Sequence, residues 1–384
     1  KDLSDEFARQ GINVYVITMS EKRDSQPTRM SIENGYNVLR VQTGNYFNCK
    51  TRLEKVKTIF TMPKKFITAA KTYLSEIKFD LIIAHTPFVS SRKIILPLKQ
   101  YFNCPAHLIL WDIFPQNAWD IGIIRNRLLF NFFKSAEIKM LQSYDNIWCM
   151  SDGNVEYIKK NYPELKNIAI ERLYNSAKIK PLPNINRKAV RQQFGYTDED
   201  VIALFGGNMG VPQRLENILE LAKRVQAKFD NAKFLFVGHG TETKRLIELA
   251  NSLNLTNVKF IHQLPRDDYE NITVAADIGL VSLDQRFTVP NFPSKTTDYF
   301  KLQLPILASL DSCAAQDYGY FLTDIAKAGR FALAGDSEEL FNCYLELYSN
   351  ADLRNILGKN GRQFYEQELD VAKACTKICQ HFKK

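Results

Sequence analysis

Residues 201–309 constrain the fold most, because they open with an apolar run, a glycine turn and an amphipathic helix in direct succession. The run is Val201–Phe205 and the turn is Gly206–Gly210. Apolar residues then recur at helical spacing at Leu215, Ile218, Leu219, Ala222 and Val225. This order is typical of a mononucleotide-binding βαβ unit, in which glycines let backbone N–H groups approach a phosphate. A glycine turn is also used for packing alone, so the turn needs support from elsewhere in the chain.

That support comes from the segment Pro293–Phe300, which reads as the start of another helix. Pro293 suits the end of a loop, and we expect Ser294 to act as the N-cap. Lys295 then falls in the first turn, where a cation opposes the helix dipole. A bound diphosphate explains a lysine there, and Asp298, one turn further on, can accept hydrogen bonds from ribose hydroxyls. The alternative is a capped helix with a solvated lysine.

Four sequence motifs in this half resemble one family of enzymes. They are the glycine loop from Phe205 to Gln213, the strand end Phe234–Gly240, the loop Phe260–Pro265 and the long segment Phe292–Ser309. Together they are similar to family 4 of the GT-B glycosyltransferases, near the bacterial lipopolysaccharide and capsule enzymes that use UDP-N-acetylated sugars. The resemblance is dense in the C-terminal half of the chain and loose in the N-terminal half.

The resemblance implies a retaining transfer of a sugar from a nucleotide-diphosphate donor, with UDP as the expected nucleotide. No metal and no other cofactor is expected. The implied donor-site residues are Gly206, Gly207, Asn208, Arg214, Gly238, Gln263, Leu264, Ser294, Lys295 and Asp298. In particular, we expect Gly206, Gly207, Ser294 and Lys295 to stabilise the charge that develops on the departing diphosphate.

The chain departs from the family pattern at three places. The family commonly carries two acidic residues eight positions apart, but the first position here is Pro290 and the second is Asp298 rather than Glu. Many members also carry Arg and Lys on the glycine loop, where this chain has Asn208 and Gln213. Arg214 or Lys295 would then have to supply the positive charge.

The expected architecture is α/β, of the GT-B type, with two Rossmann-like doubly wound domains that face a cleft. The expected domains are residues 1–180, for the acceptor, and residues 181–358, for the nucleotide sugar. Residues 359–384 are expected to return to the first domain, with a final helix from about Asn360 to Phe382. The chain opens with a helix at Asp2–Gln10, before any strand and glycine loop, so we expect the natural N-terminus to be missing.

Two residues in the N-terminal half are candidates for catalysis. Asp112 follows the apolar run Ala106–Trp111, and His85 follows Phe79–Ala84. Side chains at the carboxyl ends of parallel strands face the ligand cleft of such a domain, so Asp112 can orient an acceptor hydroxyl or accept its proton. A loop histidine with a backbone partner is equally compatible with the sequence at His85. Asp120 is an acceptor contact or a turn residue.

Charge is divided unevenly between the two halves. Residues 1–185 carry 27 Lys and Arg against 17 Asp and Glu, whereas residues 186–384 carry 24 against 25. The excess peaks at Lys50–Lys78, where Met62–Ile67 is expected to open a helix with a basic face. We expect Phe66, Ala70, Tyr73, Leu74 and Ile77 to form its core stripe and the basic face to meet an anionic membrane. No aromatic platform accompanies the charge, so nucleic acid is not an expected partner.

The sequence therefore predicts a glycosyltransferase that acts on a lipid-diphosphate-linked or glycan acceptor in cell-surface polysaccharide biosynthesis. No run of about 18 apolar residues is present, and the seven cysteines show no pairing pattern. We expect a cytoplasmic protein, peripheral at the inner face of the membrane. Two alternatives stay open: a nucleotide-sugar epimerase of GT-B-like fold, and a non-catalytic module that binds a nucleotide sugar.

Overall fold

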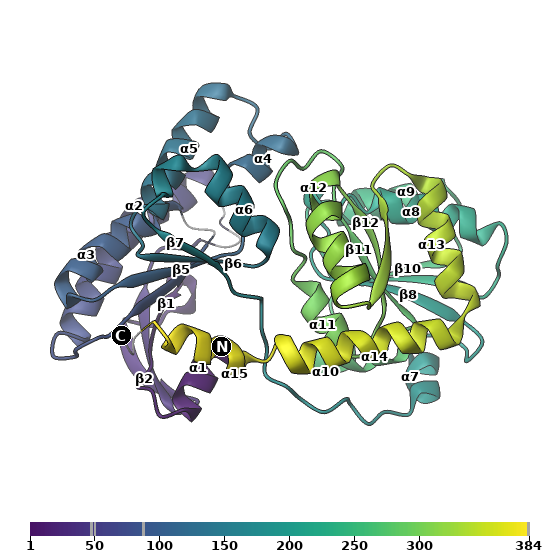
Figure 1. The fold of residues 1–384 in the computed structure, drawn as a ribbon, viewed down its shortest axis with the longest axis horizontal. Helices are drawn as coiled ribbons and strands as arrows, with labels where there is room; N and C mark the ends of the chain where they lie inside the picture. The colour runs from purple at the N-terminus through teal and green to yellow at the C-terminus, as the bar shows by residue number, and fades with distance from the viewer. Residues whose placement is uncertain (47–48, 50, 87–88, 382–384) are drawn as a thin grey trace. The chain divides into compact units, whose positions relative to one another are not determined.

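The computed structural model describes residues 1–46, 49, 51–86 and 89–381, and the chain divides into two compact units (Figure 1). The first unit comprises Lys1–Pro115, Asn126–Lys178 and Val371–Lys384. The second comprises Gln116–Arg125 and Ile179–Asp370. Each unit is an α/β body, so the α/β class predicted from the sequence is confirmed.

The second unit is built on a six-stranded sheet in the order β10-β9-β8-β11-β12-β13, and every neighbouring pair is parallel. The strands are β8 (Val201–Gly206), β9 (Ala232–Val237), β10 (Val258–Ile261), β11 (Ile278–Ser282), β12 (Ile306–Leu310) and β13 (Gly329–Leu333). The chain runs outward from β8 in one direction and then returns to β11 on its other side. That reversal is the switch point at which doubly wound sheets bind ligands.

Helices pack around this sheet because each strand is followed by an amphipathic segment. They are α4 (Gln116–Asp120), α7 (Arg187–Gln193), η4 (Val211–Gln213), α8 (Glu216–Gln226), α9 (Thr243–Ser252), α10 (Arg266–Ala275), α11 (Lys295–Lys301), α12 (Ser312–Ala314), η5 (Ala315–Gly319), η6 (Phe321–Ile325), α13 (Ser337–Ser349) and α14 (Ala351–Glu368). The predicted helix after the glycine turn is confirmed as α8, whose Ile218, Leu219, Ala222 and Val225 are all buried.

The first unit contains two smaller sheets. One has the order β1-β3-β2 and the other the order β4-β5-β6-β7, the latter entirely parallel. The strands are β1 (Tyr15–Ser20), β2 (Arg29–Glu33), β3 (Tyr36–Gln42), β4 (Ile82–His85), β5 (Ala106–Leu110), β6 (Asn146–Cys149) and β7 (Ala169–Arg172). The predicted runs Phe79–Ala84 and Ala106–Trp111 are confirmed as β4 and β5. Strand β2 is not among the predicted runs. It pairs antiparallel with β3 through Asn34-Gly35, both at positive φ, a turn that favours a hairpin.

The helices of the first unit include a pair formed by the two ends of the chain. The helices of the first unit are α1 (Asp2–Arg9), η1 (Lys22–Asp24), α2 (Arg52–Tyr73), η2 (Val89–Ser91), α3 (Arg92–Phe102), α5 (Arg127–Leu141), α6 (Asp152–Asn161), η3 (Pro163–Leu165) and α15 (Val371–Cys379). Helix α15 packs on α1, and Phe7 shares a buried cluster with Val371, Cys375 and Ile378.

The single final helix predicted from Asn360 to Phe382 is wrong. The structure has α14, which ends at Glu368, and α15, which begins at Val371, with Leu369-Asp370 between them. Helix α14 packs on α11 of the second unit, whereas α15 packs on α1 of the first unit, so the two helices belong to different units. Phe382 lies outside the described residues.

Helix α2 begins ten residues earlier than predicted, because Pro63 lies inside the helix instead of near its start. Thr51 caps the helix through its side chain, which accepts a hydrogen bond from the Glu54 N–H. The predicted core stripe is confirmed for Ala70 and Leu74, which are buried, and for Phe66 and Ile77, which pack against the same cluster. Tyr73 is largely exposed. Among the described residues, no helix is long and apolar enough to cross a bilayer.

Candidate functional site

The loops that follow β8 and β9 meet in very close contact at the carboxyl edge of the second unit's sheet. Gly238 has φ +133, and a Cβ added to it would lie 2.0 Å from the carbonyl oxygen of Gly207. A side chain at Gly238 would therefore be both strained and blocked. The Met209 N–H donates to the His239 carbonyl at 3.1 Å, and this bond holds the two loops together.

Most backbone N–H groups of the glycine loop, including those of Gly206 and Gly207, have acceptors within the chain, and the predicted role of these two glycines at a phosphate stays a prediction. The Gly206 N–H donates to the Tyr299 hydroxyl at 3.1 Å, and the Gly207 N–H donates to the Val237 carbonyl at 2.9 Å. The Gly210 N–H donates to Gln213 Oε1 at 3.1 Å. Within this loop, Asn208 keeps a backbone N–H without a partner among the described residues.

Tyr299 fixes the position of the glycine loop relative to the neighbouring strand. Its hydroxyl is fully buried and lies 3.1 Å from the Leu204 carbonyl of β8 and 3.2 Å from the Leu280 carbonyl of β11. It also accepts the Gly206 N–H. One hydroxyl thus bridges the two strands at the switch point, and its ring belongs to α11, the helix that carries Lys295 and Asp298.

Lys295 lies against the glycine loop. Its Nζ lies 4.5 Å from the centre of the Phe205 ring, and its Cε would lie 3.9 Å from a Cβ added to Gly207. Burial lowers the pKa of Lys295 to about 8, and nearby Asp298 opposes that shift. No carboxylate lies within ion-pair distance of Nζ among the described residues. The ammonium is therefore held among protein atoms with a ring face as its neighbour, which favours an anion from outside the chain.

Ser294 and Asp298 are the two other residues predicted for the donor site at the start of α11. Ser294 occupies the predicted N-cap position, but its side chain makes no capping hydrogen bond and its backbone is already helical. Asp298 lies one turn after Lys295 and reaches the surface. The protein packed around it raises its pKa, and the neighbouring cations Lys301 and Arg266 counter that rise.

Arg214 approaches a second charged group at the same edge. It has φ +36 just after η4, and its guanidinium lies 4.0 Å from Asp284, a buried carboxylate that follows β11. Arg286 donates two side-chain hydrogen bonds to the same carboxylate, at 2.9 and 2.6 Å. These bonds and both guanidinium charges keep the pKa of Asp284 below its usual range despite its burial. Two cations thus share one anion.

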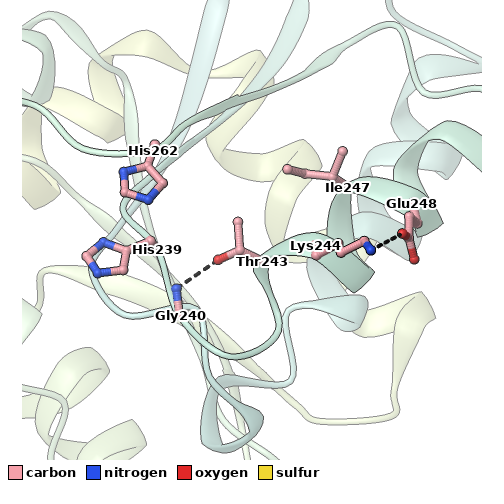
Figure 2. Close-up of a pocket in the computed structure, with 7 residues that line it drawn as sticks. All are labelled: His239, Gly240, Thr243, Lys244, Ile247, Glu248 and His262. Carbon is pink, nitrogen blue, oxygen red and sulfur yellow. Dashed lines mark hydrogen bonds and ion pairs between the residues drawn. The ribbon is translucent and has the colours of Figure 1, made fainter. Parts of the chain in front are cut away.

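A hollow of about 480 Å³ opens where β9 and β10 end, between their loops and α9 (Figure 2). The imidazole rings of His239 and His262 stack face to face on one side, with centres 4.7 Å apart and planes 7° apart. Thr243, Lys244, Ile247 and Glu248 of α9 line the other side. Gln263 and Leu264, the predicted base-binding residues, come directly after His262 in the chain and do not line the hollow.

His85 and Asp112 both lie at the carboxyl edge of the β4–β7 sheet in the first unit. The Asp112 N–H and the Trp111 N–H donate to the Thr86 hydroxyl, at 3.2 and 2.9 Å. The His85 ring stacks on Trp111 with centres 4.5 Å apart. Burial raises the pKa of Asp112. The structure thus places both candidates around one threonine, as the strand ends predicted.

His85 also has the backbone partner that the alternative interpretation requires. Its Nδ1 lies 2.7 Å from the Thr86 carbonyl, and because a carbonyl only accepts, Nδ1 must carry the hydrogen. In the neutral ring Nε2 is then the atom able to accept a proton. A structural bond and a basic nitrogen are therefore compatible in the same side chain. Pro87 lies outside the described residues.

Asp120 belongs to the second unit and acts there as a loop anchor. Its carboxylate accepts hydrogen bonds from the Thr288 N–H at 2.7 Å and the Thr288 hydroxyl at 2.9 Å. Gln116 donates to its other oxygen at 2.8 Å. The segment 116–125 thus holds the loop between β11 and α11, a role for which the local sequence gives no signal.

Sequence reasoning missed the histidine pair, Tyr299 and Arg286. His239 and His262 each stand inside a motif that the resemblance quoted, but nothing in the sequence says that their rings meet. Tyr299 was read only as part of a helix start. The pair Asp284 and Arg286 directly follows a strand at the ligand edge, which is a usable signal for a polar site.

Comparison with protein families identifies the second half of the chain. The family described as "Glycosyl transferases group 1" matches residues 186–364. A glycosyltransferase of Methanocaldococcus jannaschii is 23% identical over 270 residues, which cover 67% of this chain and 62% of that protein. WcaI of Escherichia coli K12, named as a glycosyl transferase of colanic acid biosynthesis, is 29% identical over 159 residues, 41% of this chain and 39% of its own. The chain thus aligns with less than two thirds of these relatives' lengths.

Solved structures share the fold over nearly the whole chain. Sucrose-phosphate synthase from Thermosynechococcus elongatus superposes with a TM-score of 0.77 at 18% identity, covering 99% of this chain and 91% of that one. The Anabaena protein HepE, solved in complex with UDP-glucose, superposes with a TM-score of 0.67 at 15% identity, covering 91% and 86%. At these identities the likeness concerns the fold, and it agrees with the GT-B architecture.

We expect Tyr299→Phe to destabilise the second unit by about 1–3 kcal/mol, because the buried Gly206 N–H loses its acceptor. Urea unfolding of the full chain measures the change. Tyr344→Phe is the matched control, because the buried Tyr344 hydroxyl has no hydrogen-bond partner among the described residues and its removal should cost little. Equal losses in the two variants would mean that the Tyr299 hydroxyl does not hold the loop.

Proposed function

We propose that the chain is a GT-B glycosyltransferase that transfers a sugar from a nucleotide-diphosphate donor to an acceptor hydroxyl, and the match of residues 186–364 to the group 1 glycosyl transferases supports this. The proposed donor is a UDP-sugar, and the proposed acceptor is a lipid-linked or glycan molecule of cell-surface polysaccharide biosynthesis. The observation that carries the proposal is the Lys295 ammonium at the switch-point edge of the sheet, where no carboxylate of the described residues lies within ion-pair distance.

Lys295 is proposed to bind the diphosphate and to stabilise its charge as the sugar leaves. When the bond between the sugar and the diphosphate breaks, negative charge grows on the departing oxygen. A cation that is already in place stabilises this charge without reorganisation, and it acts more strongly where water is excluded. The free Asn208 N–H is adjacent to Gly207, which Lys295 approaches, so we propose it as a second donor. Arg214 is proposed to add charge from the β11 side of the loop.

The remainder of the donor is proposed to extend along the sheet edge from α11 toward β10. Asp298 would accept hydrogen bonds from the ribose hydroxyls. The stacked rings of His239 and His262 offer a flat wall for the base, with Gln263 and Leu264 proposed to contact it from the loop that follows. HepE, which shares the fold, was solved with UDP-glucose bound, and this supports a UDP-sugar as the donor.

The acceptor is proposed to bind at the strand ends of the first unit. Asp112 would orient the attacking hydroxyl or accept its proton, and His85 would offer Nε2 for the same purpose. Membership of family 4, retention of the anomeric configuration and independence of metal ions are proposed together with this assignment. Donor charge is then neutralised by Lys295 and its neighbours, without another cofactor. The basic first unit is proposed to work at an anionic membrane.

The first test is thermal stabilisation by nucleotides. UDP at about 100 times its dissociation constant should add roughly 2.7 kcal/mol to stability, which gives a clear shift in melting temperature. GDP and ADP at the same concentration should give smaller shifts. Transfer or hydrolysis of a UDP-sugar then separates an enzyme from a binding module. A larger shift with GDP or ADP would change the donor class, and no shift with any nucleotide would contradict the proposal.

Nucleotide affinity should depend on pH through Lys295. Its pKa of about 8 means that the ammonium loses its proton above that pH. A bound diphosphate favours the charged form, so binding raises this pKa and UDP affinity should fall as pH rises through about 8. Lys295→Ala should weaken UDP binding by roughly 1.5–3 kcal/mol and remove this pH dependence. Calorimetric titration at several pH values measures both effects.

Lys295→Arg is the matched control, because guanidinium stays charged throughout this range. It should bind UDP with an affinity that changes little between about pH 7 and pH 9. A wild-type affinity that is flat across the same interval, with the fold intact, would exclude Lys295 from the diphosphate site.

The histidine wall is tested by separating the base from the phosphates. His262→Ala should weaken UDP binding by about 1–3 kcal/mol, the cost of losing one stacked ring. His262→Phe should retain most of the affinity, and neither variant should alter the binding of pyrophosphate, which has no base. A loss of pyrophosphate binding equal to that of UDP would show that the ring supports the loop and does not contact the base.

A further inference from the structure

A tryptophan lies exposed at the carboxyl edge of the β4–β7 sheet in the first unit. Trp111 directly follows β5 and is 45% exposed, whereas the residues that directly follow β6 and β7, Met150 and Leu173, are 4% and 7% exposed. Single exposed apolar residues are ordinary. An indole differs because it is large and carries a polar N–H, and tryptophans are enriched in binding interfaces. Its place at the ligand edge of a parallel sheet makes it a candidate for binding.

The backbone at Trp111 and the ring beside it are fixed by Thr86. The Trp111 and Asp112 N–H groups both donate to the hydroxyl oxygen of Thr86, which is buried. The His85 ring donates through Nδ1 to the Thr86 carbonyl and stacks on the indole, with planes 29° apart. The indole is thus positioned before any ligand arrives. A site that is already ordered loses little conformational freedom on binding.

Two polar groups at this position lack partners among the described residues. They are the indole Nε1–H of Trp111 and the side-chain carboxylate of Asp112, since the hydrogen bonds of both residues run through their backbone N–H groups. By contrast, the carboxylate of Glu137 in the same unit accepts from Tyr162 and Lys134. The indole N–H only donates and an ionised carboxylate only accepts. A ligand with hydroxyl groups, which do both, satisfies the pair.

We propose that the Trp111 ring, on the face opposite His85, binds a pyranose ring of the acceptor, whose hydroxyls bond to Asp112 and to the indole N–H. A pyranose has an apolar face of C–H groups, which matches the electron-rich face of an indole. Its rim carries hydroxyls, which match the two polar groups. This inference rests on the proposed function and names the group that the acceptor presents to the enzyme, a sugar.

A sugar fits this surface better than the two other groups that a lipid-linked acceptor can present. A hydrocarbon chain would cover the Asp112 carboxylate and offer it no hydrogen bond, which is unfavourable. A phosphate group would bring a second negative charge to the same carboxylate. The acceptor is then the product of an earlier glycosyl transfer, which has already placed a sugar on the carrier.

The experiment is ligand-observed NMR of the full chain in the presence of UDP. The probes are methyl glycosides of glucose, galactose, mannose, rhamnose, fucose and N-acetylglucosamine, with octyl phosphate as the sugar-free probe. At least one glycoside should bind. Trp111→Ala should weaken the best of them by roughly tenfold, the loss expected for one stacked ring. Trp111→Phe should retain most of the affinity, because a ring remains for both the sugar and His85. Asp112→Asn should weaken the same glycoside without changing octyl phosphate binding.

Tyr101→Ala is the matched control, because Tyr101 is an aromatic residue of the same unit that is 42% exposed on α3, away from the strand ends. It should bind glycosides like the unaltered chain. Melting temperature and UDP affinity are recorded for every variant and should not change, since the nucleotide is proposed to bind the second unit.

Three outcomes would overturn the inference. One is glycoside binding by Trp111→Ala equal to that of Tyr101→Ala, and another is a panel in which no glycoside binds the unaltered chain. The third is octyl phosphate binding that falls in Trp111→Ala while glycoside binding does not. Absence of UDP binding by the unaltered chain would instead contradict the proposed function, and the glycoside titration repeated without UDP still decides the role of Trp111.

Discussion

A lysine ammonium that lies against a phenylalanine ring is the constraint on which the proposed donor site of the second unit depends. Lys295 keeps its charge near the glycine loop although burial lowers its pKa to about 8 and no carboxylate lies within ion-pair distance among the described residues. Partial burial of an ammonium without an anionic partner is unfavourable. A structure that maintains this arrangement is prepared for an anion, and the parallel sheet supplies the edge at which that anion can arrive.

The residues around Lys295 fix the glycine loop and the strands against which the lysine lies. Tyr299 ties β8 to β11 through one hydroxyl, and the same hydroxyl occupies the Gly206 N–H. Gly238 allows the two loops to touch where any side chain would collide. Helix α14 packs on α11, and a Cβ added at Gly358 would lie 2.3 Å from the carbonyl oxygen of Gln303, two residues after α11. The Gly206 N–H thus helps to hold the glycine loop in position, and the positive charge of the site comes from side chains.

The two units differ in how their charged and apolar side chains are arranged. The second unit pairs charged groups with one another, as in the group formed by the buried Asp284 and the partly exposed Arg214 and Arg286. The first unit exposes the indole ring of Trp111 next to the Asp112 carboxylate, which has no partner among the described residues.

The sequence by itself determined the parallel α/β architecture, the position of the strands and the candidate residues at their carboxyl ends. Apolar periodicity and glycine placement are local properties, and parallel strands bring their ends to one edge whatever the side chains are. Only the tertiary structure decided which N–H groups are free, that His239 stacks on His262, that Asp120 holds Thr288, and that the exposed Trp111 ring stacks on His85. Those facts depend on contacts between residues far apart in the chain, and no local sequence pattern predicts them.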